Sequence, residues 1–355
     1  MGLIEKTLEP ALEFLKNLKN LKRGVVFCGH DLDTICSTVI LLNFLKRRGK
    51  DAKYFISQFN YKLSKDCLEY FKKKRFEFVI IVDVPEIEKN YLEFFANHSK
   101  VLIIDHHPIK EYYKKVFYSN PRIFKEKIYM PATYICYKLY SNFFASKPID
   151  LIAGLGTLAD KGIECCLDLY KKMKKYGWIE SLETIYCSRL FLAVKILGSW
   201  LIEGNRKKVD ECIKFLMRVK SLDEILRAKK FLKKFEDVEK EIKKSLEDFE
   251  KKKKKIGDFF VYKLKSKYRL QSMVATLLAS RIKGNLIVYQ KWKGYYKASF
   301  RRNESDLDLG LAAKEIAQRI GAEGGGHPEA ASIARIKREK EFLKEVRNYE
   351  RKVLR

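Results

Sequence analysis

The first 160 residues of the chain alternate short apolar runs with amphipathic segments. Five apolar runs each lead into polar residues or proline, in the segments GVVFCGHD (24–31), DAKYFIS (51–57), EFVIIVDVP (77–85), KVLIIDHHP (100–108) and KVFYSNP (115–121). Runs of this kind are typical of strands, and the continuously apolar ones of buried parallel strands. The segments between them carry apolar residues at helical spacing, as in TVILLNFLKRRG (38–49), which a glycine ends. This alternation predicts a mostly parallel sheet with helices on both faces.

Beyond about residue 165 the pattern changes twice. The chain first becomes helical, and residues 221–256 carry one narrow apolar stripe that predicts a single long helix between two domains. The last hundred residues again combine apolar strands with helices. We therefore expect an α/β fold in three parts: an N-terminal domain with a parallel sheet flanked by helices (1–200), a long helical linker (201–256) and a smaller C-terminal α/β domain (257–355).

The charge of the chain favours a polyanionic partner. The 355 residues carry a formal net charge of +29, and such an excess is typical of proteins that bind nucleic acid. Lysine enrichment also accompanies adaptation to heat, and many of these lysines lie on predicted helix faces, where a solvated surface explains them. The apolar runs are too short for a membrane helix, and the acid-containing N-terminus does not resemble a signal peptide. The eight cysteines form no C-x-x-C pair, so we expect a cytoplasmic protein without membrane association.

Acidic residues and histidines collect where the predicted strands end. They are Asp31 and Asp33 after the first strand, Asp83 after the third, Asp105, His106 and His107 after the fourth, and Asp160 in a predicted helix. Because α/β sheets bind ligands at the carboxyl ends of parallel strands, we expect these side chains to converge. Five carboxylates in one place need a counter-charge. Mixed Asp and His ligands suit Mn²⁺, with Mg²⁺ as the alternative, and this many ligands suit two ions about 3.5–4 Å apart that hold a phosphate and lower the pKa of a bridging water.

These segments resemble the motifs of the DHH-family phosphoesterases. Asp105-His106-His107 matches the motif that names the family, Asp31-x-Asp33 its first motif, Asp83 its second, and GLGTLAD, ending in Asp160, its fourth. The tail resembles the family's C-terminal associated domain through SFR (299–301) and GGGHPEAAS (324–332). Asp-His-His alone is equally well explained as an ordinary strand-end loop, but five motifs in the family's order are a strong signal.

The resemblance implies a role for each matched residue. The metal ligands would be Asp31, Asp33, Asp83, His106 and Asp160, with Asp83 between the two ions. His107 would face the scissile phosphate, and Asp105 would orient a histidine ring. In the C-terminal domain, backbone N–H groups of Gly324, Gly325 and Gly326 would approach a phosphate, with Arg301 and His327 as charged donors. The alternative is a tight turn in which these glycines serve only the backbone. The active site would then lie in a cleft between the two domains.

Two positions depart from the family pattern. Thr34 follows Asp33, where the family usually has a small residue and most often glycine, so it could narrow the space beside the metals. His30 directly precedes the Asp-x-Asp pair, closer than the comparable residue of relatives. It is either a further metal ligand or a loop histidine bonded to the backbone.

The tail and the charge separate the activities found in this family. GGGHP differs from the Arg-Lys-Lys signature of the family's pyrophosphatases, and the charge of +29 favours a longer nucleic acid over a dinucleotide. We therefore expect an exonuclease on single-stranded DNA or RNA that uses Mn²⁺, similar to compact archaeal RecJ-like nucleases, with replication or repair proteins as further partners. The alternatives are an oligoribonucleotide or pAp-type nucleotide phosphatase and a non-catalytic replication or repair scaffold.

Overall fold

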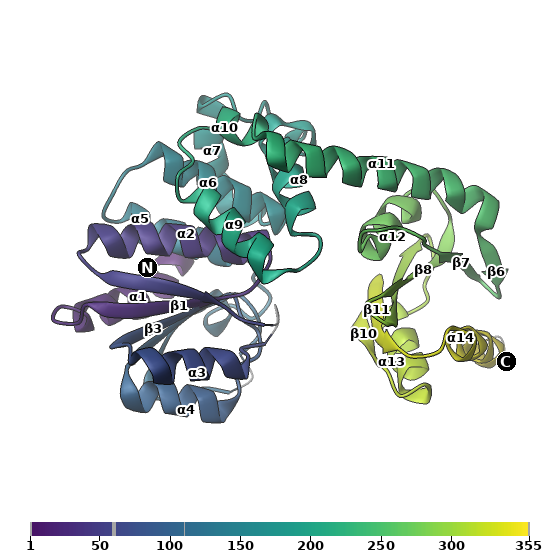
Figure 1. The fold of residues 1–355 in the computed structure, drawn as a ribbon, viewed down its shortest axis with the longest axis horizontal. Coiled ribbons are helices and arrows are strands. Elements are labelled where there is room, and N and C mark those ends of the chain that lie inside the picture. Colours follow the sequence, from purple (N-terminus) through teal and green to yellow (C-terminus); the bar gives the residue numbers. More distant parts are fainter. Residues whose placement is uncertain (1, 59–61, 110, 354–355) are drawn as a thin grey trace. The chain divides into compact units, whose positions relative to one another are not determined.

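The computed structural model describes residues 2–58, 62–109 and 111–353, and it divides into two compact units. The first unit comprises Met1–Phe235 and the second Glu236–Arg355. The division falls within one long helix, α11 (Lys229–Lys252). Figure 1 labels the helices and strands of both units, which we describe one at a time.

The first unit is built on a five-stranded parallel sheet in the order β2-β1-β3-β4-β5. Its strands are β1 (Arg23–Cys28), β2 (Asp51–Ile56), β3 (Phe78–Val82), β4 (Lys100–Ile104) and β5 (Val116–Ser119). Alternate side chains of β1 enter different cores: Val26 and Cys28 pack in one, and Val25 and Phe27 in the other. The predicted parallel sheet, buried on both faces, is confirmed.

Helices cover both faces of this sheet (Figure 1). One face packs against α1 (Leu3–Asn17), α2 (Leu32–Arg47) and α5 (Ala132–Ser141), and the other against α3 (Lys65–Lys74) and α4 (Lys89–His98). The remaining helices of the unit are α6 (Lys147–Ala159), α7 (Leu167–Lys175), α8 (Arg189–Leu201), α9 (Arg206–Leu216) and α10 (Leu222–Leu226). Because α2 contacts both the sheet and α5 and α6, it is buried around most of its circumference. Among the helices of the described segments, none is both long and apolar enough to cross a membrane.

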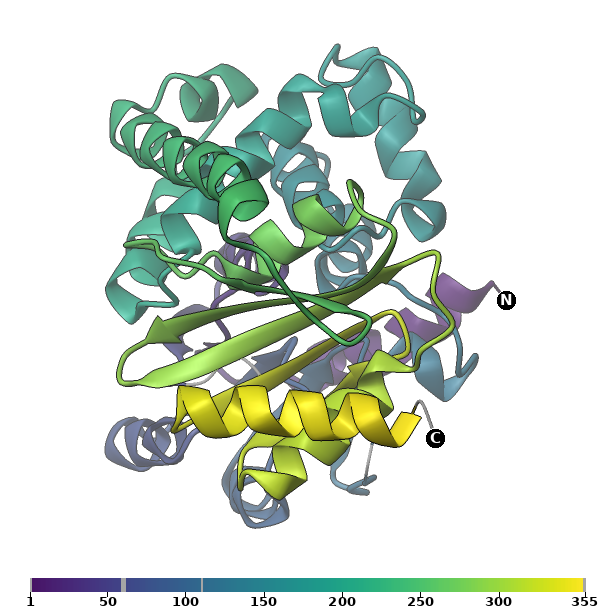
Figure 2. The same ribbon diagram turned by 90° about the vertical axis from the view of Figure 1, so that its right-hand side faces the viewer.

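The second unit is built on a six-stranded mixed sheet in the order β10-β11-β9-β8-β7-β6. Its strands are β6 (Lys254–Ile256), β7 (Phe259–Lys263), β8 (Gly284–Trp292), β9 (Tyr295–Asn303), β10 (Glu323–His327) and β11 (Ala330–Ile336). On one face pack α13 (Leu309–Arg319) and α14 (Glu339–Val353), the latter running along the sheet in Figure 2. On the other face, α12 (Gln271–Ala279) contacts β8 and β9. The predicted smaller C-terminal α/β domain is confirmed.

Two expectations about local structure are wrong. Residues 221–256 do not form one helix, because α10 ends at Leu226, α11 begins at Lys229, and a short strand follows. Ile225 and Phe231, on either side of the break, are buried in the same core, so apolar spacing carries no sign of it.

The second concerns the GGGHP segment, for which a tight turn was one interpretation: Gly324–His327 lie in a strand instead. Gly324–Gly326 lie in β10 and pair antiparallel with β11. Glycine has little strand propensity, so tertiary contacts impose this conformation. A Cβ at Gly324 would lie 2.6 Å from the carbonyl oxygen of Ala313 in α13, and the close approach of that helix therefore requires glycine here.

Candidate active site

The predicted site residues of the first unit lie at the ends of three adjacent strands and two helices. Asp31 caps α2, and its Oδ1 accepts a hydrogen bond from the Thr34 backbone N–H at 2.9 Å. Asp83 follows β3, the segment Asp105–His107 follows β4, and Asp160 ends α6. Because β1, β3 and β4 are neighbours in the sheet, their carboxyl ends bring these residues to one edge.

Two overlapping groups of ligand atoms form at this edge. Asp83 Oδ1 is 3.3 Å from His106 Nε2 and 3.7 Å from His107 Nδ1. Asp160 Oδ2 is 3.8 Å from the same His106 nitrogen. Oxygen and imidazole donors in this arrangement suit a divalent cation. The first group comprises Asp83, Asp105, His106 and His107. The second comprises Asp33, His106 and Asp160. Within each group, each residue offers one ligand atom, and these atoms all lie within 4.8 Å of one another.

Buried atoms without hydrogen bonds mark the centre of the cluster. Within the described part of the chain, neither Asp83 Oδ1 nor His106 Nδ1 has a hydrogen-bond partner, although the two residues are only 5% and 4% exposed. Asp83 also has a φ of +53°, in the left-handed region that is uncommon for residues other than glycine. Buried polar atoms without partners are rare. A cation would satisfy the carboxylate oxygen, so these residues fit a metal.

The electrostatics of the cluster also fit a cation. Burial first, and then the nearby Asp83, raise the pKa of Asp33 well above its ordinary value. Burial also raises the pKa of Asp160. Burial alone would raise the pKa of Asp83, but proximity to His106 and a hydrogen bond from Thr34 outweigh it and lower the pKa. A divalent cation would stabilise the ionised forms of all three carboxylates.

Asp105 contacts the two histidines that follow it. Its Oδ1 accepts hydrogen bonds from the backbone N–H groups of His106 at 2.7 Å and His107 at 3.1 Å, and it lies 2.8 Å from His107 Nδ1. Burial alone would lower the pKa of His107, but the hydrogen bond with Asp105 outweighs it and raises the pKa. These contacts fix the orientation of the His107 ring.

Two residues that the sequence analysis did not assign hold the same segment. Asn120 Nδ2 donates to the carbonyl oxygen of His107 at 2.9 Å, and Arg122 Nε donates to that of His106 at 2.6 Å. Both lie just past β5. The only signal there was an Asn-Pro pair, which indicates a turn and not a contact with another strand end.

Asp33 is held by the beginning of α5. Its Oδ2 accepts from the backbone N–H of Ala132 at 3.0 Å and its Oδ1 from that of Thr133 at 2.9 Å. A carboxylate is stabilised at a helix N-terminus. His30 places Nε2 2.6 Å from the carbonyl oxygen of Ser57, a backbone contact made by loop histidines and also by the second ring nitrogen of metal-binding histidines.

Thr34 fills the space between two predicted ligands. Its side chain is fully buried, and its Oγ1 lies 2.7 Å from Asp31 Oδ1 and 2.6 Å from Asp83 Oδ2. Tyr129, which no sequence motif includes, donates a hydrogen bond from its hydroxyl to Asp160 Oδ2 at 2.7 Å. The side-chain contacts of the cluster thus extend beyond the motif residues.

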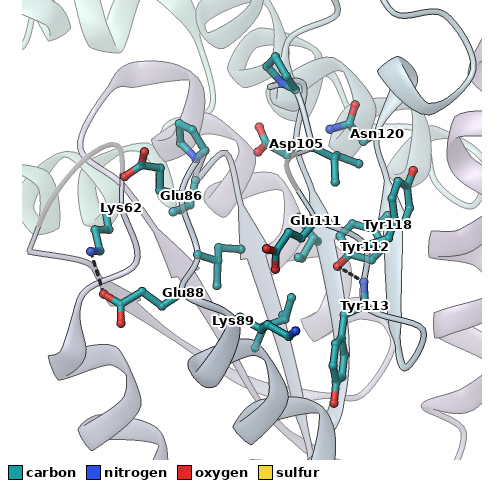
Figure 3. Close-up of a pocket in the computed structure, with 17 residues that line it drawn as sticks. Lys62, Glu86, Glu88, Lys89, Asp105, Glu111, Tyr112, Tyr113, Tyr118 and Asn120 are labelled. Atoms are coloured by element: carbon teal, nitrogen blue, oxygen red, sulfur yellow. Dashed lines mark hydrogen bonds and ion pairs between the residues drawn. The ribbon is translucent and has the colours of Figure 1, made fainter.

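A pocket of about 580 Å³ lies beside Asp105 (Figure 3). Asp105 and Asn120 line one part of it, and Tyr112 and other aromatic and aliphatic side chains line the rest. An ion pair between Lys62 and Glu88, 2.7 Å apart, lies at its edge. The carboxyl edge of the sheet therefore carries a concave surface next to the histidine segment.

Three of the predicted residues of the second unit, Arg301, Gly325 and His327, share one face of its sheet, whereas Gly324 and Gly326 lie on the opposite face. The strand register aligns His327 with Arg301 across β11, and Gly325 lies in the next row. Because residues in register point to the same face, these positions lie together. Arg301 donates to Thr276 Oγ1 and Ser272 Oγ of α12 at 3.1 Å each, and His327 is exposed. This face therefore presents positively charged and polar donors.

The first unit carries a buried cluster of acids and histidines at the carboxyl edge of its parallel sheet, and a unit with a mixed sheet follows it. These features define a class of α/β protein with a candidate divalent-metal site. Family comparison narrows this class. Residues 24–158 match the N-terminal domain of the DHH family, and residues 258–352 match the DHHA1 domain. The chain belongs to the DHH family of phosphoesterases and carries the C-terminal DHHA1 domain.

Solved structures share the fold. RecJ of Thermus thermophilus in complex with Mn²⁺ has a TM-score of 0.71 at 15% identity; the match covers 98% of this chain and 55% of the Thermus chain. An exonuclease RecJ bound to manganese has a TM-score of 0.69 at 15% identity, covering 100% and 95% of the two chains. CDC45 from Entamoeba histolytica has a TM-score of 0.60 at 10% identity, covering 98% and 99%. No sequence among curated proteins matches the chain. At these identities the comparisons show a RecJ-like fold.

Proposed function

We propose that this chain is a divalent-metal-dependent phosphodiesterase that hydrolyses single-stranded nucleic acid from an end. The cluster around His106 carries the proposal, because its two overlapping groups together supply four carboxylates and two imidazoles, enough ligands for two cations. The RecJ-like fold and the net charge of +29 support a polyanionic substrate. We propose Mn²⁺ as the cation, with Mg²⁺ as the alternative.

Each side chain has a separate part in this proposal. The cations, when bound, would polarise the phosphate and activate water. Asp105 orients the His107 ring, which would donate a hydrogen bond to the phosphate. In the second unit, Arg301, His327 and Gly324–Gly326 would bind a phosphate. The proposed cation ligands are Asp31, Asp33, Asp83, His106 and Asp160, with His30 as a further candidate.

The test is a time course with end-labelled single strands. DNA and RNA labelled at either end are incubated with Mn²⁺, Mg²⁺ or EDTA. Stepwise shortening from one end supports the proposal, and Asp83→Asn should reduce it by at least ~10³-fold, because a neutral amide cannot replace the charge of a carboxylate that would hold a cation. Asp306→Asn, an exposed acid of the second unit, is the control and should retain activity.

The same assay separates the alternatives. Turnover of dinucleotides but not of longer strands would identify a short-oligonucleotide phosphatase. A folded protein that binds Mn²⁺ but hydrolyses none of these substrates would support the role of a non-catalytic scaffold.

A further inference from the structure

Tyr129 lies at the edge of the metal cluster, between the 3₁₀ turn Pro121–Ile123 and α5. Its hydroxyl donates to Asp160 Oδ2 at 2.7 Å. Its ring centroid is 5.0 Å from that of His106, with an angle of 70° between the planes. The residue is nevertheless 42% exposed. One side chain therefore contacts two predicted ligands and still presents aromatic surface to solvent.

The hydroxyl and the ring of Tyr129 have separable effects. The hydroxyl donates a hydrogen bond to one oxygen of Asp160 and so fixes the position of that oxygen. This bond requires no exposed ring. The ring is nearly perpendicular to His106 and so is not stacked on it. Packing in the core does not explain the exposed ring of Tyr129 either, because a core tyrosine such as Tyr170 is almost fully buried.

We propose that the ring of Tyr129 stacks on the nucleobase next to the scissile phosphate. This inference rests on the proposed function and specifies its substrate: the phosphate at the cluster must belong to a nucleotide with a base within reach of the ring. Inorganic polyphosphate would gain nothing from Tyr129. Stacking on an aromatic side chain contributes about 1–3 kcal/mol per base and tolerates every base, which suits an enzyme that degrades mixed sequences.

Three variants separate the ring from the hydroxyl. Tyr129→Phe keeps the ring and removes the hydroxyl, whereas Tyr129→Leu removes both. Tyr186→Leu is the matched control, because Tyr186 has a similar exposure of 45% and its ring contacts Phe191 instead of the cluster. The unfolding temperature of each variant reports whether it folds.

The substrates are a short single strand and the same strand with abasic terminal nucleotides. Tyr129→Leu should raise KM for the intact strand about 5–150-fold, which is the stacking energy converted at about 1.4 kcal/mol per tenfold. It should change KM for the abasic strand less than twofold. Tyr129→Phe should keep the wild-type KM for the intact strand while weakening Mn²⁺ binding in calorimetry. Tyr186→Leu should behave as wild type.

The dissociation constant of a labelled strand, measured by anisotropy in EDTA, tests stacking without turnover. Weaker binding by Tyr129→Leu than by Tyr129→Phe supports the inference even if the protein hydrolyses no strand, a result that would refute only the proposed function. Equal effects of the two variants on strand binding, or equal effects of Tyr129→Leu on intact and abasic strands, overturn the inference and leave the proposed function standing.

Discussion

Replacing Thr34 with valine tests whether this residue organises the metal cluster or obstructs it. The family usually has glycine at this position, and the structure shows why threonine matters: its hydroxyl lies between Asp31 and Asp83. Valine has nearly the same shape and lacks only the hydroxyl. The fully buried site therefore keeps its packing, and the change isolates the two contacts with carboxylates.

The contact geometry sets the magnitude. The distances from Thr34 Oγ1 to the carboxylate oxygens are 2.7 Å for Asp31 and 2.6 Å for Asp83. A hydroxyl has one proton, so it donates to one of them at a time. A hydrogen bond to a charged group contributes about 1.5–3 kcal/mol. If this energy orients Asp83 for the cation, Thr34→Val should weaken Mn²⁺ binding about 10–150-fold. Loss of residues that orient metal ligands typically costs 10–100-fold.

Calorimetric titration with Mn²⁺ measures the effect directly and needs no substrate. Thr34→Ser keeps the hydroxyl and should bind Mn²⁺ within about threefold of wild type, a spread of well under 1 kcal/mol. Thermal unfolding without metal checks that both variants fold. Equal Mn²⁺ affinity of wild type and Thr34→Val would refute the reasoning. Tighter binding by Thr34→Val would show that the hydroxyl competes with the cation for the carboxylates.

Three further predictions concern the substrate and the second unit. If the basic surface follows a strand backbone, affinity for a 20-mer should fall steeply with salt while dinucleotide affinity changes little; equally shallow slopes would indicate that the charge of +29 is mainly a solvated surface. His327→Ala should raise KM and lower kcat but leave calorimetric Mn²⁺ affinity unchanged, and lost metal binding would instead make His327 a ligand. Burial alone would raise the pKa of Glu339, but hydrogen bonds from Lys263, Tyr289 and Tyr296 outweigh it and hold the pKa below its ordinary value of 4.5. Its contribution to stability is therefore present above that value and is lost as pH falls through the lowered pKa. Glu339→Gln should cost about 1–3 kcal/mol at pH 7 in thermal unfolding, and this cost should decrease as the pH is lowered below 4.5. A cost that does not change with pH would contradict the prediction.

The sequence predicted those parts of the fold that local pattern controls. Strands such as Phe78–Val82 are buried on both faces, so every position is apolar and the strand stands out. The strand Glu323–His327 does not, because its glycines carry no apolar signal and its conformation depends on β11 and α13. Contacts between segments distant in sequence therefore determine the conformation of this strand.

The same distinction applies to the candidate site. The aspartates and histidines at strand ends were predictable, because the order of parallel strands fixes where their ends lie. Tyr129 and Arg122 lie in the connection between β5 and α5, and no periodicity relates them to Asp160 or His106. Asp33 was only partly predictable. Its place in the cluster was expected, but its hydrogen bonds with the start of α5 depend on how that helix packs.

The buried acids of the site depend on a cation to different degrees. Asp33 accepts two backbone hydrogen bonds from α5, and Asp105 makes three contacts through one oxygen. Asp83 receives the Thr34 hydroxyl on Oδ2, while its Oδ1 has no hydrogen bond within the described part of the chain. Protein contacts alone do not compensate these charges, because burial and the neighbouring Asp83 still raise the pKa of Asp33. Asp83 thus combines a positive φ, a carboxylate oxygen without a hydrogen bond within the described residues and repulsion with Asp33, and bound cations would compensate the negative charge that causes the repulsion.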